Sequence, residues 1–345
     1  MCYTIGINNT QSLTHRLALP DVLRGGAIIL VVCGHSFLPL ASMIPNYQLG
    51  IKYALIWNFH MPFLFFVSGL FASRLLKRTF KDAVIRKVRQ LIVPYLLFSA
   101  LEITVNILLG GLTNTKLQPI NYLTMLVQPV QEMWFIYVLF FLFMLYYAIH
   151  KLLDKHLGSS TKFSVELILV VLGFILFFIG KDVQIWVIPQ IMNYFVFFTL
   201  GAASFNLLRN PSIKLWVNIV VLIPPLVVYV FLCKFNIFIA DANLLLAFGL
   251  IRTLFGIVTF ILLSLLLIRV SLLSKFLQYC GVASILIYLL QTYPMQGFRI
   301  IIFNVTHILN PLVYEIFGSL LGVAVPLIIY YFFNGTKAYS LIFGR

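Results

Sequence analysis

An arginine and a histidine are spaced so that one helix carries both side chains on a single face. Arg24 and His35 are eleven residues apart in the stretch RLALPDVLRGGAIILVVCGHSFLPL, residues 16–40. At ~100° per residue this separation is about three full turns, and His35 lies ~16 Å beyond Arg24 along the helix axis. The residues from Gly25 onward are apolar, so we expect the histidine about half-way across a bilayer core. Ionisable groups are costly at that depth and usually mark a polar pathway or a reaction site.

The composition predicts that this helix is one of many in a membrane. Hydrophobic residues make up 62% of the 345 residues and charged residues only 10%, against about 25% charged residues in soluble domains. The mean hydropathy is +1.04. We therefore expect an all-α, polytopic transmembrane helical bundle that forms a single domain over residues 1–345, with no appended soluble domain and no cleavable signal peptide. The four cysteines have neither paired nor metal-like spacing and are expected to be small apolar side chains.

Ten segments are apolar and long enough to cross a bilayer. They are residues 22–43, 53–73, 90–110, 133–150, 163–180, 186–206, 213–233, 244–268, 282–303 and 311–333. The loop between the second and third segments holds seven Lys and Arg residues, which predicts that it lies in the cytoplasm. If each span carries the chain to the opposite side of the membrane, 18 of the 24 basic residues and both termini lie on the cytoplasmic side. The same bias accounts for the net charge of +15, so we expect no nucleic-acid partner.

Further polar residues and helix breakers lie at the ends of other spans. The second span holds FHMPFLFFVSG at 59–69, which includes His60, and the third begins with RKVRQLIVPY at 86–95, where Pro94 is expected to kink or restart the helix. WFIYVLF at 134–140 follows Glu132 at the start of the fourth span. GVASILIYLL at 281–290 precedes Gln291 and Pro294, which are expected to interrupt the ninth.

Together with Asp21 and Arg24 followed by His35, these motifs resemble the acyltransferase-3 family of integral-membrane acyltransferases, in particular its fucose 4-O-acetylase-like and O-antigen O-acetyltransferase branch. The resemblance implies an O-acetyltransferase of the bacterial inner membrane. It would move an acetyl or other acyl group from cytoplasmic acyl-CoA to a sugar hydroxyl of a surface polysaccharide, such as O-antigen, lipopolysaccharide or exopolysaccharide, or of its lipid-linked precursor. Acetyl-CoA would be a donor substrate, and no permanently bound cofactor or metal is expected. The family often carries a histidine where this chain has Gln291, so we assign Gln291 no catalytic role.

The residues suit that reaction. Histidine titrates near neutral pH and can remove the proton of a reacting hydroxyl, so His35 is the expected general base, with Glu132 as its carboxylate partner. Arginine forks bind phosphate groups, which a CoA donor carries. The expected donor-binding residues are Asp21, Arg24, Arg86 and Arg89, and the expected substrate-binding residues are His60 and Trp134.

Each of these assignments has a structural alternative. His35 could hydrogen-bond a neighbouring helix, and Asp21 with Arg24 could form an anchoring pair at the membrane interface. Arg86 and Arg89 could reflect only the bias of basic residues toward the cytoplasm. His60 could have a structural or substrate-lining role, Trp134 could belong to the aromatic belt, and Glu132 could be solvated at the outer surface. Arg252, Arg299 and Glu315 could pair with one another or contact a polar acceptor.

A second class of function is open at this point. Buried polar groups also line the solute pathways of transporters, so an exporter of a polar or lipid-linked solute is the alternative to an acyltransferase. The two classes predict different partners. The enzyme requires acyl-CoA, a carbohydrate or lipid-linked glycan acceptor and the lipid bilayer, whereas the exporter requires no acyl donor.

Overall fold

The computed structural model is all-helical over the residues that it describes, namely 18–44, 47–110, 116–157, 162–209, 211, 213–234 and 241–344, and contains no strand within these ranges. The expected fold class is confirmed. The first half contains α1 (Ala18–Phe37), α2 (Leu40–Met43), α3 (Ile51–Trp57), α4 (His60–Gly69), α5 (Phe80–Lys87), α6 (Val93–Leu109), α7 (Asn121–Thr124) and α8 (Trp134–Leu157). The second half contains α9 (Lys162–Ile179), α10 (Ile188–Leu208), α11 (Leu215–Lys234), α12 (Ala242–Leu267), α13 (Ser271–Val282), α14 (Ser284–Leu290), α15 (Thr292–Thr306), α16 (Pro311–Phe333) and α17 (Lys337–Phe343).

Nine helical segments within the described residues are long and apolar enough to cross a membrane. They correspond to nine of the ten expected spans and are 18–43, 51–74, 80–109, 131–156, 188–208, 215–234, 242–267, 284–306 and 311–333. The remaining expected span, 163–180, coincides with α9, whose 18 residues extend ~27 Å at 1.5 Å per residue. This length is close to the thickness of a bilayer core.

The helix breaks at Pro94 and Gln291 occur where the sequence predicts them. Val88–Ile92 forms a π-helical turn, and α6 starts again with Pro94 in its first turn. Proline lacks an N–H and fits best at such a start, where no intrahelical bond is required of it. At the other position, Gln291 separates α14 from α15.

The basic loops are more helical than expected. Thr79 caps α5 by accepting a hydrogen bond from the backbone N–H of Asp82 at 3.2 Å, so residues 80–87 extend the third span at its N-terminal end. The connection before the ninth span contains α13, which packs along α1. Glycines at the crossing allow this close approach, because a Cβ at Gly25 would stand 1.9 Å from the carbonyl oxygen of Leu277.

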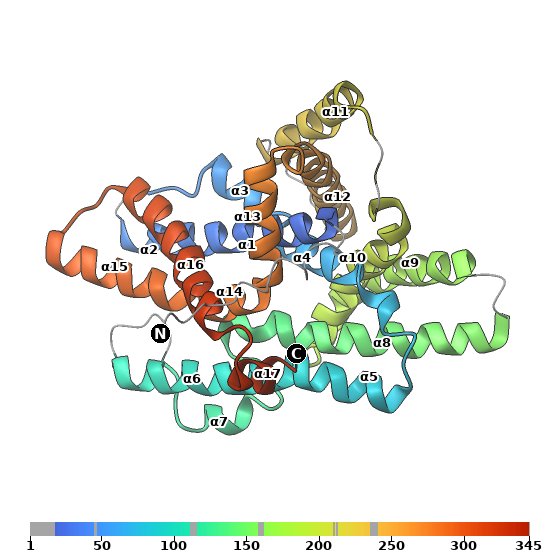
Figure 1. Cartoon of the computed structure of the whole chain (residues 1–345). Coiled ribbons are helices and arrows are strands. Elements are labelled where there is room, and N and C mark those ends of the chain that lie inside the picture. The colour runs from blue at the N-terminus through green and yellow to red at the C-terminus, as the bar shows by residue number, and fades with distance from the viewer. Residues whose placement is uncertain are drawn as a thin grey trace, which may run out of the picture.

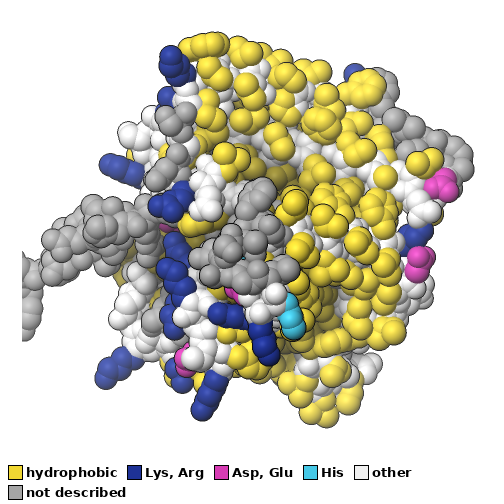
Figure 2. All heavy atoms as spheres, turned by 90° about the vertical axis from the view of Figure 1, so that its right-hand side faces the viewer, with side chains coloured by type: hydrophobic (Ala, Val, Ile, Leu, Met, Phe, Trp, Pro, Cys, Tyr) yellow, Lys and Arg dark blue, Asp and Glu magenta, His cyan; other side chains and the backbone are white. Residues whose placement is uncertain are grey.

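The helices arrange around α1. In Figure 1, α1 runs through the middle of the molecule, α5, α6 and α8 lie along the lower edge, and α11 pairs with α12 at the top. Large apolar side chains are exposed on several outer helices, including Val171, Val220, Leu244 and Ile316. A surface of this kind is suited to contact with lipid. Figure 2 shows that Lys and Arg side chains gather on one part of the face drawn there, while hydrophobic side chains cover most of the rest.

Candidate active site

A cavity of about 790 Å³ opens beside the first turns of α1. Its walls come from α1, α4, α5, α8, α13, α14 and α17, from the turn that follows α4, and from the π-helical turn Val88–Ile92. The lining is Asp21, Arg24, Ile28, Leu64, Ser68, Phe71, Arg74, Leu75, Arg78, Arg86, Lys87, Gln90, Leu91, Phe135, Ile136, Leu139, Phe143, Val282, Ser284, Ile285, Tyr288, Phe343 and Gly344. This volume is in the usual range for small-molecule sites.

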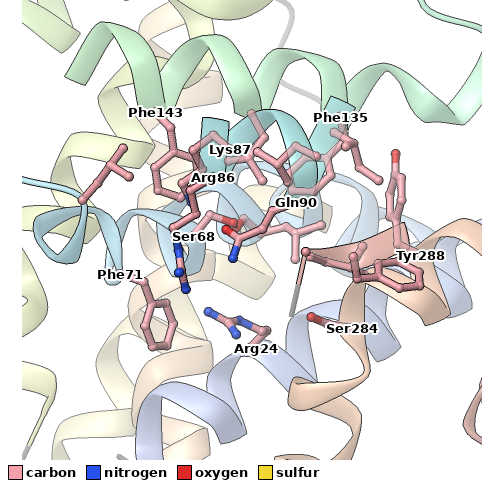
Figure 3. Close-up of a pocket in the computed structure, with 18 of the residues that line it drawn as sticks. Arg24, Ser68, Phe71, Arg86, Lys87, Gln90, Phe135, Phe143, Ser284 and Tyr288 are labelled. Atoms are coloured by element: carbon pink, nitrogen blue, oxygen red, sulfur yellow. The ribbon is translucent and has the colours of Figure 1, made fainter. Parts of the chain in front are cut away.

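Five cationic side chains line this cavity, against one carboxylate. Arg24 and Lys87 are half-buried, whereas the other three, Arg74, Arg78 and Arg86, are exposed and so lie at the mouth of the cavity. In Figure 3, Arg24 on α1 and Arg86 on α5 point toward the same space from opposite walls. The excess of positive charge makes this cavity suitable for a polyanion such as a chain of phosphate groups.

Aromatic rings hold three of these cations in place. The ring of Phe71 lies between two guanidinium groups, with its centroid 4.0 Å from the Cζ atom of Arg24 and 5.0 Å from that of Arg74. The Nζ atom of Lys87 lies 3.2 Å from the centroid of the Phe143 ring. Such contacts stabilise a cation and fix its position in the cavity wall.

Three of the four expected donor-binding residues line the cavity. Asp21, Arg24 and Arg86 do so, but Arg89 does not. A π-helical turn begins at Val88, between Arg86 and Arg89. Because a π-turn has more residues per turn, it rotates the following side chains relative to an α-helix. Arg89 lies behind the lining, against Gly344, which itself lines the cavity.

Sequence reasoning missed three cations of the cavity, namely Arg74, Arg78 and Lys87. All three belong to the basic segment that indicated the cytoplasmic side. Their positive charge is visible in the sequence. However, nothing there distinguishes them from Lys77 and Lys81, which carry the same charge in the same segment and do not line the cavity.

His35 lies further along α1, outside the cavity lining. It is half-buried, and its ring makes an edge contact with Trp57 at 6.3 Å between centroids. Glu132 is close enough for the two charges to interact, so the expected base and its carboxylate partner come together. They do so from segments about a hundred residues apart in the chain.

His60 occupies a structural position next to Trp57. Its Nδ1 atom lies 3.2 Å from the carbonyl oxygen of Ile56 and 3.1 Å from that of Trp57, at the end of α3. Two carbonyl acceptors require the hydrogen on Nδ1, which leaves Nε2 as an acceptor. The Trp57 ring lies 4.9 Å from the imidazole ring of His60 and so contacts both histidines. Sequence reasoning did not single out this tryptophan.

Trp134 lies in an aromatic cluster inside the bundle. Its ring centroid is 5.4 Å from that of Tyr194 and 6.0 Å from that of Phe65, and the side chain packs against the hydrophobic core. These contacts differ from a plain position in an aromatic belt at the membrane surface.

A group of ionisable side chains surrounds Glu132 beyond the cavity. We call His35, Glu102, Glu132 and Tyr293 the polar cluster, since Glu132 interacts electrostatically with each of the other three. Tyr288 connects the two regions. It lines the cavity, and its hydroxyl donates a hydrogen bond to the backbone carbonyl of Glu132. The cavity therefore runs from a cationic mouth to a wall that borders the polar cluster.

The other intramembrane charges do not pair with one another. Glu315 accepts hydrogen bonds from Lys52 and from the hydroxyl of Tyr47, both at 2.7 Å. Burial and the neighbouring Glu315 raise the pKa of Tyr47 to about 12, so Tyr47 stays protonated at neutral pH. The Arg252 guanidinium lies over the ring of Phe248 at 5.7 Å. In the described part of the chain, no group of three or more His, Cys, Asp and Glu side chains is positioned to hold a metal ion.

Comparison with known families agrees with this architecture. An acyltransferase domain, that of the acyltransferase-3 family, matches residues 18–331, which is most of the chain. The chain therefore belongs to that family and is a multi-pass membrane acyltransferase. No curated protein and no solved structure matches the chain. Family membership favours the enzyme over the exporter.

Proposed function

We propose that this protein transfers an acyl group, in the first place acetyl, from cytoplasmic acyl-CoA to a hydroxyl of a carbohydrate acceptor. One observation carries the proposal. A single cavity holds Arg24, Arg74, Arg78, Arg86 and Lys87 and ends at Tyr288, beside the polar cluster that contains His35. The cations suit the phosphates of CoA. The ~16 Å from Arg24 to His35 along α1 is within the reach of an extended pantetheine arm.

His35 acts first as a general base and then as a general acid in this reaction. Its neutral imidazole takes the proton of the acceptor hydroxyl while the hydroxyl oxygen attacks the thioester carbonyl carbon. The carbon–sulfur bond then breaks, the thiolate leaves, and the imidazolium returns the proton to the sulfur. The products are an O-acyl ester and free CoA. Glu132 orients the imidazole and stabilises its charged form while it holds the proton.

The two sides of the membrane have different roles in this proposal. The cationic mouth receives the donor in the cytoplasm, where acyl-CoA is made. The acceptor is a surface polysaccharide or its lipid-linked precursor, and it approaches from the membrane or the outer side of the bacterial inner membrane. Because the thioester meets the hydroxyl inside the bundle, the charged CoA headgroup does not have to cross the bilayer.

The test uses the full chain purified into lipid nanodiscs with radiolabelled acetyl-CoA. We expect acetyl-CoA to bind and its acetyl group to pass to an acceptor glycan or, more slowly, to water. His35→Ala should reduce both reactions ~10²–10⁴-fold, the usual contribution of a general base, and should leave donor binding intact. His156→Ala, at the exposed end of α8, is the matched control and should keep full activity. Near-normal transfer by His35→Ala would refute the assignment of the base.

A further inference from the structure

The short helix α17 packs on the segment that follows the donor-site cations of α5. It contacts the π-helical turn Val88–Ile92 and α6, and Figure 1 shows it beside α6 at the lower edge of the molecule. Two of its seven residues, Tyr339 and Phe343, are buried, and their ring centroids lie 4.7 Å apart. Two aromatic side chains thus anchor a helix that is otherwise at the surface.

Contacts with the end of α16 fix where α17 begins. The hydroxyl of Thr336 accepts a hydrogen bond from the backbone N–H of Tyr339 at 3.1 Å and so caps the helix. The Tyr339 ring also packs on α16, with its centroid 5.8 Å from that of Tyr330 and 5.8 Å from that of Phe333. Such a framework holds the far end of α17 at a defined place.

That far end reaches the wall of the donor cavity. Phe343 and Gly344 both line the cavity. Gly344 ends α17 with a φ of +60°, and it lies so close to the π-helical turn that a Cβ there would stand 2.8 Å from the Cβ of Arg89. The contact involves the Cβ and the backbone of Arg89, so α17 supports the turn itself from behind the lining.

Gln90, the next residue of the turn, faces the cavity. In Figure 3 its amide points toward the same space as the guanidinium groups of Arg24 and Arg86. A primary amide both donates and accepts hydrogen bonds. It can therefore donate to a phosphate oxygen, or pair with an amide group of a pantetheine arm, beside the cations that bind the phosphates.

We propose that Gln90 is a further donor-binding residue and that α17 positions it through the π-helical turn. The contact of Gly344 with Arg89 holds the backbone from which the Gln90 side chain extends, so the amide meets the donor only while α17 is docked. Because α17 lies beyond residues 18–331, which match the acyltransferase domain, family membership by itself gives it no role. This inference rests on the proposed function.

The first test adds a methyl group where α17 meets the turn, in the full chain in nanodiscs. Gly344→Ala should push the end of α17 away from Arg89 and raise the Kd for acetyl-CoA about three- to tenfold, the equivalent of one neutral hydrogen bond. The rate of acetyl-CoA hydrolysis at saturation should stay within about twofold of wild type, since binding that is equal in the ground and transition states affects KM alone.

Gly110→Ala at the end of α6 is the matched control. Its φ of +51° is also left-handed, but no atom would lie within 4 Å of its Cβ. The control therefore introduces the same backbone strain without the overlap, and it should leave the Kd unchanged. A Kd raised equally by both variants would show that strain, and not the contact with Arg89, is the cause.

A double-mutant cycle shows whether α17 acts through Gln90. Gln90→Ala alone should raise the Kd for acetyl-CoA by about the same three- to tenfold as Gly344→Ala. The variant with both changes should lose no more than the larger single loss, because the position of the turn no longer matters once the amide is absent. Losses that multiply would overturn the inference.

Tyr339→Ala undocks α17 in a second way. Tyr339 does not line the cavity, so a three- to tenfold loss of donor affinity in this variant must pass through α17. Tyr331→Ala, at a side chain that is 72% exposed on α16, is its control and should bind acetyl-CoA as wild type does. A lower rate at saturation with an unchanged Kd, in either α17 variant, would show that α17 supports the reaction centre and not the donor site.

The failures of the two proposals are distinguishable. If wild-type protein binds acetyl-CoA and Gly344→Ala, Tyr339→Ala and Gln90→Ala bind it equally well, the role of α17 is wrong and the donor cavity stands. If wild-type protein does not bind acetyl-CoA, the proposed function itself is wrong.

Discussion

Replacing Arg86 and Arg89 separately by alanine should give unequal losses of donor affinity. The two arginines are three residues apart and carry the same charge, yet only Arg86 lines the cavity. A charge-assisted hydrogen bond to a phosphate contributes about 1.5–3 kcal/mol. Because Arg86 is exposed, solvent screening reduces its share to the lower end of that range. We expect Arg86→Ala to raise the Kd for acetyl-CoA about tenfold, and Arg89→Ala to change it less than about twofold.

Arg24 should have the largest effect of the three. Its side chain is half-buried, and its Cζ atom lies 4.0 Å from the Phe71 ring centroid, so it is both less screened and better held than Arg86. A loss near the upper end of the range corresponds to about a hundredfold in Kd. Arg24→Lys should recover only part of it, since an ammonium group cannot make the two parallel bonds of a guanidinium.

Isothermal titration calorimetry of nanodisc-embedded protein with acetyl-CoA measures these differences. Titrations at low and high salt separate the contributions, because screening weakens exposed contacts more than buried ones. The affinity of wild-type protein and of Arg24→Lys should therefore fall as salt rises, and that of Arg86→Ala should fall less steeply. Equal losses for Arg86→Ala and Arg89→Ala would show that net positive charge, and not the cavity, binds the donor. Unchanged affinity in all variants would refute the donor site.

Two further predictions concern topology and packing. In a variant whose native cysteines are replaced by serine, a cysteine introduced at position 81 should be protected from an impermeant thiol reagent in intact cells, and one at position 116 should react. Labelling of position 81 from outside would place the cationic mouth on the wrong side of the membrane for cytoplasmic acyl-CoA. Gly25→Ala should destabilise the protein by about 1–3 kcal/mol, because the new Cβ would overlap the carbonyl oxygen of Leu277 and force α1 from α13. Gly297→Ala is the control, because a Cβ at that position would have no atom within 4 Å, and it should leave the melting temperature unchanged or raise it. Equal melting temperatures for both variants would contradict the close packing at Gly25.

Local periodicity accounts for the features that sequence analysis predicted well. The spacing of Arg24 and His35 depends only on helix geometry, and both lie in the single helix α1. Pro94 marks a helix restart because proline has no N–H to give to the hydrogen-bond ladder and fits best in a first turn. Gln291 marks the second restart, between α14 and α15. The π-helical turn Val88–Ile92, which holds Arg89, has no such local signal and is visible only in the folded backbone.

The pairing of distant residues required the tertiary structure. Trp57 and Trp134 both lie near span ends in the sequence, but only Trp57 contacts His35, whereas Trp134 packs against Phe65 and Tyr194. The burial of Gln291 also depends on the fold, which leaves its side chain 0% exposed and neither amide atom hydrogen-bonded among the described residues.

The sequence by itself determined the class of this protein and the axis of its site. Hydropathy, basic loops and the interval between Arg24 and His35 can each be read from a single segment. An apolar segment in a bilayer must be helical, because its backbone has to satisfy its own hydrogen bonds there. The tertiary structure decided which charges share a cavity. Helix packing selected Arg74, Arg78 and Lys87 from an evenly basic segment and brought Glu132 to His35. These relations depend on crossings such as that of α1 and α13 at Gly25, where contact between backbones sets the positions of the side chains.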